Sequence, residues 1–293
     1  MEATILTDLF LPLSLGIIML GMGLSLVPAD FKRVVKYPKA ATLGLFNQIV
    51  LLPIVGFALL LLMPMRTPEL AVGIMILAAS PGGPTSNLIS HISKGDTALS
   101  ITLTAISSII VVITIPIIVN FSMKFFLQAG DYVPLPIFDT IVKVLIITII
   151  PVTIGMLIRS KTPQFAAKMD RPVKIMSGVL LIVIILATVL NDRENMLSFF
   201  AQAGPVALAL NVVMLVLGYV SARMFNLHSS QSITISIETG IQNGTLGIAI
   251  AATLLHNPTM TISPAIYSLI MFMTAGIIIA YMNIFVKEQK IKA

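Results

Sequence analysis

This sequence has few charged residues and no cysteine. Only 10% of its 293 residues are charged, whereas 57% are apolar. This number of charges is too small to give an aqueous domain a solvated surface. The composition therefore predicts a protein of the lipid bilayer. Cysteine is absent, which excludes disulfides, thiolate metal sites and cysteine nucleophiles.

Long basic runs are missing as well, although the net charge is +6. No run exceeds Lys32-Arg33, and the cations border apolar stretches, which argues against nucleic-acid binding and points to membrane topology. Glu2 and Asp8 stand where a signal peptide would have its basic region. We therefore expect the first apolar segment to be retained as a membrane span.

Nine segments are candidates for membrane spans, since a spanning helix needs about 20 mostly apolar residues. Seven are continuous, over residues 5–27, 40–63, 101–126, 136–158, 172–190, 205–225 and 261–286. The other two are interrupted: residues 68–93 by Pro81-Gly82-Gly83-Pro84, and residues 229–255 by the run from Thr239 to Gly244. Because glycine and proline disfavour a continuous helix, the sequence predicts an all-α membrane protein with two broken helices.

The basic residues provide a test of this count, because cytoplasmic loops of membrane proteins are rich in Lys and Arg. With nine spans and the N-terminus outside, 14 of the 18 cations fall on the cytoplasmic side. The external cations are Arg66, Lys124, Lys143 and Arg193, and they are accompanied by the acids Glu2, Asp8, Glu69, Asp131, Asp139, Asp192 and Glu194. The pattern predicts an external N-terminus and a cytoplasmic C-terminus.

The two interrupted segments occupy matching positions, each preceded by two continuous spans and followed by one. Residues 1–126 are therefore expected to form one four-helix repeat, residues 127–171 a connecting helix, and residues 172–293 a second repeat. The repeats begin five helices apart, so they have opposite orientations in the membrane. Inverted repeats with discontinuous helices indicate a transport site near the bilayer midplane.

Glu238 is the one acid that lies inside a predicted span. A charged side chain at that depth costs at least ~2.5 kcal/mol, so it faces the protein interior and needs a partner. No Lys or Arg is expected beside it, which leaves a cation from solution or a proton. Oxygen-bearing side chains suit a hard cation, and those expected near this level are Thr85, Ser86, Asn87, Ser100, Thr104, Gln48, Gln242 and Asn243.

An anionic substrate has a reason to bind at the same level, because the half-helices that begin near Thr85 and Asn243 direct positive dipole ends and amide donors toward the centre. Other polar residues are expected to have plainer roles. His91 and His256 lie near helix ends and are expected at the membrane interface. Ser90 and Thr97 are expected to bond to carbonyls of their own helices.

Four motifs together resemble the bile acid:sodium symporter family over nearly the whole chain. They are Gly21-Met22-Gly23-Leu24, Pro-Gly-Gly-Pro-Thr-Ser-Asn at 81–87, Gly-Asp-Thr-Ala-Leu-Ser at 95–100, and Glu-Thr-Gly-Ile-Gln-Asn at 238–243. The chain looks like a nine-helix bacterial member. The resemblance implies a bacterial inner-membrane protein with a core domain around two crossing broken helices and a panel domain, each assembled from both repeats.

The resemblance also implies two sodium sites. The first would use Ser86, Asn87, Ser100, Thr104 and Glu238, and the second Gln48, Glu238, Thr239, Ile241 and Gln242, partly through backbone oxygens. The implied activity is sodium-driven import of a small organic anion, such as a bile acid-like compound or a monocarboxylate (pantoate or pyruvate), by alternating access. The expected substrate contacts are Thr85, Asn243, Pro84 and Gly244. Pro84 stands where many relatives carry a small or hydroxylated residue, so bile acid transport is not assumed.

Four alternatives differ in mechanism. A proton-coupled organic anion carrier would use Glu238 as its proton relay. Arsenite exporters resemble this fold but use a membrane cysteine, which is missing here. An intramembrane hydrolase would need a nucleophile with a base, or paired acids, and a lone carboxylate argues against it. A passive channel would show conductance instead of saturable uptake. Membrane lipid is the expected surrounding, with no nucleic-acid or obligate protein partner.

Overall fold

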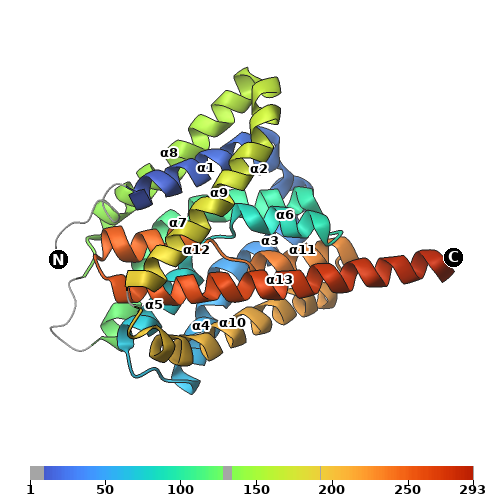
Figure 1. Cartoon of the computed structure of the whole chain (residues 1–293). Coiled ribbons are helices and arrows are strands. Elements are labelled where there is room, and N and C mark those ends of the chain that lie inside the picture. Colours follow the sequence, from blue (N-terminus) through green and yellow to red (C-terminus); the bar gives the residue numbers. More distant parts are fainter. Residues whose placement is uncertain (1–9, 128–133, 192, 293) are drawn as a thin grey trace.

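The computed structural model describes residues 10–127, 134–191 and 193–292, and this part of the chain is almost entirely helical (Figure 1). The acids Glu2, Asp8, Asp131 and Asp192, assigned above to the external side, lie outside the described residues. The elements in chain order are α1 (Leu11–Ser25), α2 (Pro28–Lys36), α3 (Pro38–Phe46), the π-helical turn η2 (Asn47–Leu51), α4 (Leu52–Leu62), α5 (Pro68–Ala79), α6 (Pro84–Ile92), α7 (Thr97–Phe126), α8 (Ile137–Lys161), α9 (Pro163–Asn191), α10 (Met196–Met224), α11 (Ser229–Gly240), α12 (Gly244–Ala249), the π-helical turn η3 (Ile250–Leu254) and α13 (Pro258–Lys292).

Within the described residues, six helices are long and apolar enough to cross a membrane, counting the run from α3 to α4 as one. A seventh span results if α1 and α2, which are bent by 65° at their junction, are counted together. The prediction of an all-α membrane protein is thus confirmed. The count of nine stays a prediction, because the halves of the two interrupted helices are too short to span alone.

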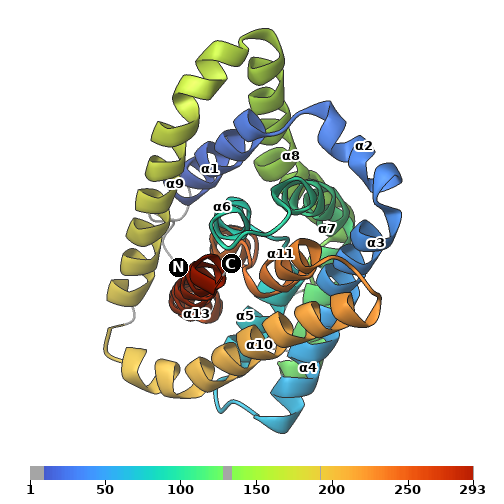
Figure 2. The ribbon, with the colours of Figure 1, turned by 90° about the vertical axis from the view of Figure 1, so that its right-hand side faces the viewer.

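Both interruptions occur where the sequence predicts them. Helix α5 ends at Ala79 before α6 begins at Pro84, and α11 ends at Gly240 before α12 begins at Gly244. The two breaks meet in the middle of the molecule (Figure 2), where Gly82 and Gln242 form an isolated antiparallel bridge. The Asn243 N–H donates to the Pro81 carbonyl at 2.9 Å. Peptide groups released by one break therefore satisfy those released by the other.

Helix α5 is apolar on every side, so it is buried, and the first break at its C-terminal end lies in the centre of the protein. All residues from Leu70 to Ala79 are buried, and α5 contacts α4, α7, α10 and α13. A helix that is hydrophobic all round is stable only when other elements cover it. Burial of α5 therefore fixes the level at which the chain unwinds.

Helices α1, α8 and α9 form a layer on one side of the crossing, most clearly seen in Figure 2. Helices α1 and α8 approach so closely that a Cβ on Gly23 would lie 2.1 Å from the Val152 carbonyl oxygen. A Cβ on Gly155 would lie 2.3 Å from the Leu20 carbonyl oxygen. Only glycine permits such contact, so these two residues fix the packing of this layer.

Two helices depart from the predicted course. The second predicted span contains the π-helical turn η2, in which the Leu52 N–H donates to the Asn47 carbonyl five residues earlier. Pro53 follows directly and has no N–H to offer the regular pattern, which favours the wider turn. Helix α9 begins at Pro163 and continues through Pro172, whereas the predicted span begins at residue 172.

Candidate functional site

Glu238 lies near the C-terminus of α11, one turn before the break, with 2% of its surface exposed. Its carboxylate accepts hydrogen bonds from the hydroxyls of Ser86 at 2.6 Å and Thr104 at 2.8 Å, and from that of Ser100. Among the described residues no Lys or Arg forms a salt bridge with it. The negative charge is therefore held by three neutral hydroxyls, each of which also carries oxygen lone pairs.

The spacing of these hydroxyls follows from helix geometry. Ser100 and Thr104 lie four residues apart on one face of α7, and α7 is anchored by Asp96, whose carboxylate accepts the Leu99 N–H at 3.1 Å. Ser86 lies in the first turn of α6, where its hydroxyl oxygen is also 2.7 Å from the Gly83 carbonyl oxygen, an alternative acceptor for its single hydrogen. Two helices, α6 and α7, thus direct hydroxyls to one carboxylate on α11.

Asn87 connects this cluster with a neighbouring cavity. Its Oδ1 lies 2.8 Å from the Ser100 hydroxyl and 3.4 Å from the Thr104 hydroxyl, as an alternative acceptor to the Glu238 carboxylate. The residue itself lines the cavity described below. A change in the oxygen cluster can therefore reach the cavity through one side chain.

A second polar cluster joins Gln48, in the π-helical turn η2, to Gln242 in the break after α11. The Gln48 amide donates to Gln242 Oε1 at 2.6 Å and to the Ser80 carbonyl at 3.0 Å. The Gln242 amide donates to the Thr239 carbonyl at 2.8 Å and reaches the Glu238 carbonyl at 3.4 Å. Several amide and peptide oxygens thus lie close together beside the backbone of Glu238.

The Thr239 side chain takes no part in that cluster. Its hydroxyl bonds to the carbonyls of Met214 at 3.0 Å and Ile235 at 2.9 Å. Ile241 is fully buried next to Gln242. Of the predicted second group, the structure brings together Gln48, Gln242 and the backbone of Glu238 and Thr239, and leaves the Thr239 hydroxyl out.

Asn211 and Tyr267 support the second break, and the sequence argument missed both. The Gly240 carbonyl, which a continuous helix would bond internally, accepts hydrogen bonds from Asn211 Nδ2 and from the Tyr267 hydroxyl, both at 2.8 Å. Both side chains are fully buried, on α10 and α13 respectively. The signal that could have identified Asn211 is its place as a lone amide in the apolar stretch 205–225.

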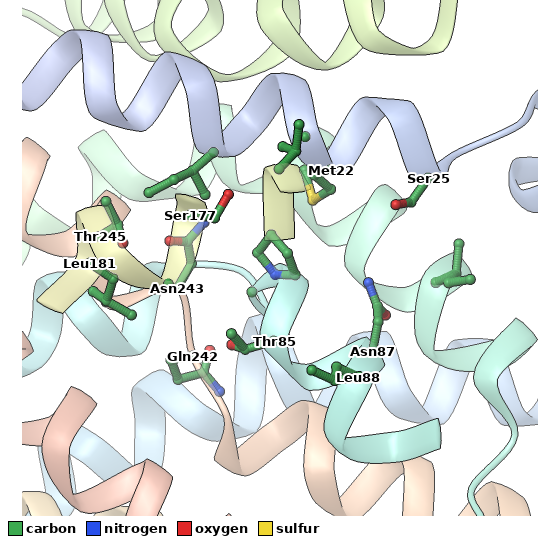
Figure 3. A pocket seen from close by; sticks show the side chains of 18 of the residues that line it. Met22, Ser25, Thr85, Asn87, Leu88, Ser177, Leu181, Gln242, Asn243 and Thr245 are labelled. Atoms are coloured by element: carbon green, nitrogen blue, oxygen red, sulfur yellow. The ribbon is translucent and has the colours of Figure 1, made fainter. Parts of the chain in front are cut away.

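A cavity of about 330 Å³ lies between the crossing and the layer formed by α1 and α9 (Figure 3). All four predicted substrate residues, Thr85, Asn243, Pro84 and Gly244, line it. On the opposite side the wall is formed by Met22, Val173, Ser177 and Leu181, among others. Thr85 and Thr245, the second residues of α6 and α12, also line the cavity, on the side of the two breaks. The Ser86, Gly244 and Leu246 N–H groups already donate to the Gly83 carbonyl, the Gln242 carbonyl and Asn243 Oδ1. The first-turn N–H groups that can face an anionic ligand at this end of the cavity are therefore those of Thr85 and Thr245.

The oxygen-bearing side chains around Glu238 suit the binding of a cation. In the described part of the chain, no three His, Asp or Glu side chains gather into a metal-binding group. A cation here would be held by hydroxyl, amide and peptide oxygens around one carboxylate, which are ligands that hard cations accept.

Comparison with known proteins agrees with this geometry. The model of the sodium bile acid symporter family matches residues 12–199. A Bacillus subtilis protein named an uncharacterized sodium-dependent transporter is 28% identical over 281 residues, covering 96% of this chain and 85% of its own length.

Two eukaryotic proteins are similar over much of the chain. A chloroplastic rice protein (Oryza sativa subsp. japonica), named a probable sodium/metabolite cotransporter, is 32% identical over 264 residues, covering 89% of this chain but 60% of its own length. The hepatic sodium/bile acid cotransporter of Homo sapiens is 28% identical over 264 residues, covering 87% of this chain and 72% of its own length.

Proposed function

This chain belongs to the sodium bile acid symporter family, a family of transporters rather than enzymes, and from that premise we propose that it imports a small organic anion driven by sodium. The observation that carries the proposal is the Glu238 carboxylate, which is buried with three hydroxyls and is linked through Asn87 to a cavity. Sodium is a substrate of this cycle, taken up and released with the anion.

The first sodium ion would bind among Ser86, Asn87, Ser100, Thr104 and Glu238. Without a cation the three hydroxyls donate to the carboxylate. When a cation arrives, each hydroxyl can rotate and offer a lone pair in place of its hydrogen. The ion compensates the charge that Glu238 brings into an apolar surrounding, where an unpaired charge is costly.

The second sodium ion would bind beside the second break, with Gln48, Gln242 and the peptide oxygens of Glu238, Thr239 and Ile241 as its ligands. The unwound backbone supports this role, because carbonyls there are no longer bound within a helix. Binding would require the hydrogen bond between the Gln48 and Gln242 side chains, 2.6 Å long, to rearrange.

The substrate would bind in the cavity with its carboxylate near Thr85, Asn243 and the first turn of α12, while Pro84 and Gly244 form part of the adjoining wall. A volume of about 330 Å³ lies at the small end of the range of about 300–1,000 Å³ for ligand pockets. We therefore favour a small carboxylate over a bile acid. Pantoate and pyruvate are suitable first probes.

Alternating access would come from movement of α1, α8 and α9, taken as the panel, against the remaining helices, taken as the core. The cavity lies between these groups, whereas the three hydroxyl partners of Glu238 all belong to the core. We also propose that the four-helix repeats, the nine spans and the cytoplasmic C-terminus predicted from the sequence hold for this protein.

Uptake by purified protein in liposomes provides the test. The Ser100→Ala variant should raise the sodium concentration for half-maximal uptake by about tenfold, the loss expected for one hydrogen bond to a charged group. Ser108→Ala is the matched control on the same helix, because its buried hydroxyl donates only to the Thr104 carbonyl, at 2.7 Å. Equal sodium dependence in both variants would refute the first site.

A proton-coupled carrier is the second candidate, because Glu238 could take up a proton instead of sodium. In liposomes that carry either a sodium gradient or a pH gradient, the proposal predicts uptake with the sodium gradient alone. Glu238→Gln resembles the protonated acid, so it should abolish sodium dependence. Uptake that follows the pH gradient and ignores sodium would select the proton mechanism.

A further inference from the structure

The face of α6 that lines the cavity ends at a histidine. Pro84, Leu88 and His91 recur at the spacing of one helix face, and all three line the cavity. The opposite face carries Ser86 and Ser90, which bond to Glu238 and Thr234 of α11. One side of α6 thus serves the oxygen cluster, and the other is available to the substrate.

His91 is the one titratable side chain among the described residues that line the cavity. It is exposed, and its Nδ1 lies 3.3 Å from the Thr97 hydroxyl, which belongs to α7 and also lines the cavity. This contact orients the ring and leaves Nε2 as the second polar atom. A histidine can donate from Nε2 as a neutral ring and from both nitrogens when charged.

His91 lies at the other end of α6 from the carboxylate position proposed above. Six residues separate it from Thr85, which corresponds to about 9 Å along a helix at about 1.5 Å per residue. Apolar side chains, among them Leu88 and Ile101, lie on the cavity wall with these polar ends. The cavity therefore offers hydrogen-bond donors at two separated points with an apolar stretch beside them.

We infer that His91, together with Thr97, forms a second anion subsite that selects dicarboxylates over monocarboxylates of the same length. This inference rests on the proposed function, which supplies the first carboxylate position. An acid of about five or six carbons has the length to place one carboxylate near Thr85 and the other near His91, given the helix rise. The substrate class assigned to this cavity is thus a short dicarboxylate.

The test compares glutarate with valerate, which have the same number of carbons and differ by one carboxylate. Sodium-dependent binding of each acid to the full-length protein is measured by competition or calorimetry. The wild type should bind glutarate at least about tenfold more tightly than valerate, as expected for one hydrogen bond to a charged group. His91→Phe should remove this preference, measured within the variant as the ratio of its glutarate affinity to its valerate affinity.

Two further variants sharpen the result. His91→Gln keeps a donor amide and should retain part of the preference. His256→Gln is the matched control, because His256 is exposed and does not belong to the cavity wall. Preserved sodium binding in each variant shows that the protein is folded.

Each failure has a distinct meaning. If His91→Phe binds glutarate as tightly as the wild type, or if the wild type does not prefer glutarate, the second subsite is refuted while sodium-dependent valerate binding still supports the proposed function. If sodium binds but strengthens the binding of neither glutarate nor valerate, the dicarboxylate assignment is likewise refuted. If sodium itself does not bind, the proposed function fails with it.

Discussion

Adding one methyl group at Gly82 should disable the proposed first sodium site without altering any of its proposed ligands. Gly82 lies in the first break, and a Cβ built on it would lie 2.6 Å from Glu238 Oε2 and 3.4 Å from the Thr104 hydroxyl. Ordinary contact between heavy atoms is about 3.5 Å, so the carboxylate oxygen would have to retreat by almost 1 Å. Its hydrogen bond to Thr104, 2.8 Å long, would then be lost.

The expected cost follows from the type of bond. A hydrogen bond to a charged group contributes about 1.5–3 kcal/mol, so Gly82→Ala should weaken sodium binding by roughly 10- to 150-fold. The backbone itself permits alanine, because no left-handed φ occurs at this position. The effect should therefore appear in sodium affinity more than in folding.

Gly83→Ala provides the matched control. A Cβ there would have its nearest neighbour, the Thr85 hydroxyl, at 3.4 Å, which is ordinary contact. Both variants replace neighbouring glycines in the same break, so their effects on the unfolded chain should be alike. Gly83→Ala should bind sodium as the wild type does.

Equilibrium binding of radioactive sodium to purified protein is the direct assay. Thermal unfolding followed by helical circular dichroism is a second, because bound sodium stabilises the folded state by mass action. This optical signal suits a chain that has neither tryptophan nor cysteine. Wild-type sodium affinity in Gly82→Ala would refute the placement of the Glu238 carboxylate at the ion site.

Three other changes test separate parts of the structure. Tyr267→Phe should weaken sodium binding by roughly fivefold, because the Gly240 carbonyl loses one of its two donors, about 1 kcal/mol; unchanged sodium binding would mean that this hydroxyl does not support the site. Gly155→Leu should separate α1 from α8 and lower the midpoint of thermal unfolding, and an unchanged midpoint would contradict the close contact. The chain has no cysteine of its own, so single cysteines can report the orientation. Val35→Cys on α2 should react with an impermeant maleimide only from the cytoplasm, and Leu197→Cys on α10 only from outside; both side chains are well exposed, at 84% and 85%. The reverse labelling pattern would overturn the proposed orientation.

The sequence was sufficient to predict the parts of this protein that depend on local chemistry. Both helix interruptions follow from local composition, because proline lacks the N–H of the regular hydrogen-bond ladder and glycine has low helix propensity. Glu238 was identifiable because a lone acid in an apolar segment demands a partner. The hydroxyls of Ser100 and Thr104 were paired by their four-residue spacing alone.

Features that depend on the packing of distant segments were not predictable in the same way. The π-helical turn that presents Gln48 needs Pro53 together with its packing, and the periodicity of an apolar run does not reveal it. Asn211 and Tyr267 lie 29 and 27 residues from the carbonyl that they hold. The position of His91 on the cavity wall depends on how α6 is placed relative to α1 and α9, which its place near a helix end does not reveal.

The cavity wall is divided between two groups of helices, and this division separates the residues that surround the solute from those that surround Glu238. Residues from α1 and α9, such as Met22, Ser177 and Leu181, line the cavity, whereas the hydroxyls bonded to Glu238 belong to α6 and α7. Under the proposed function, substitutions on this side would change which anion fits and leave the hydrogen bonds to Glu238 in place. Solute specificity and coupling to the driving ion could therefore change independently of each other in this architecture.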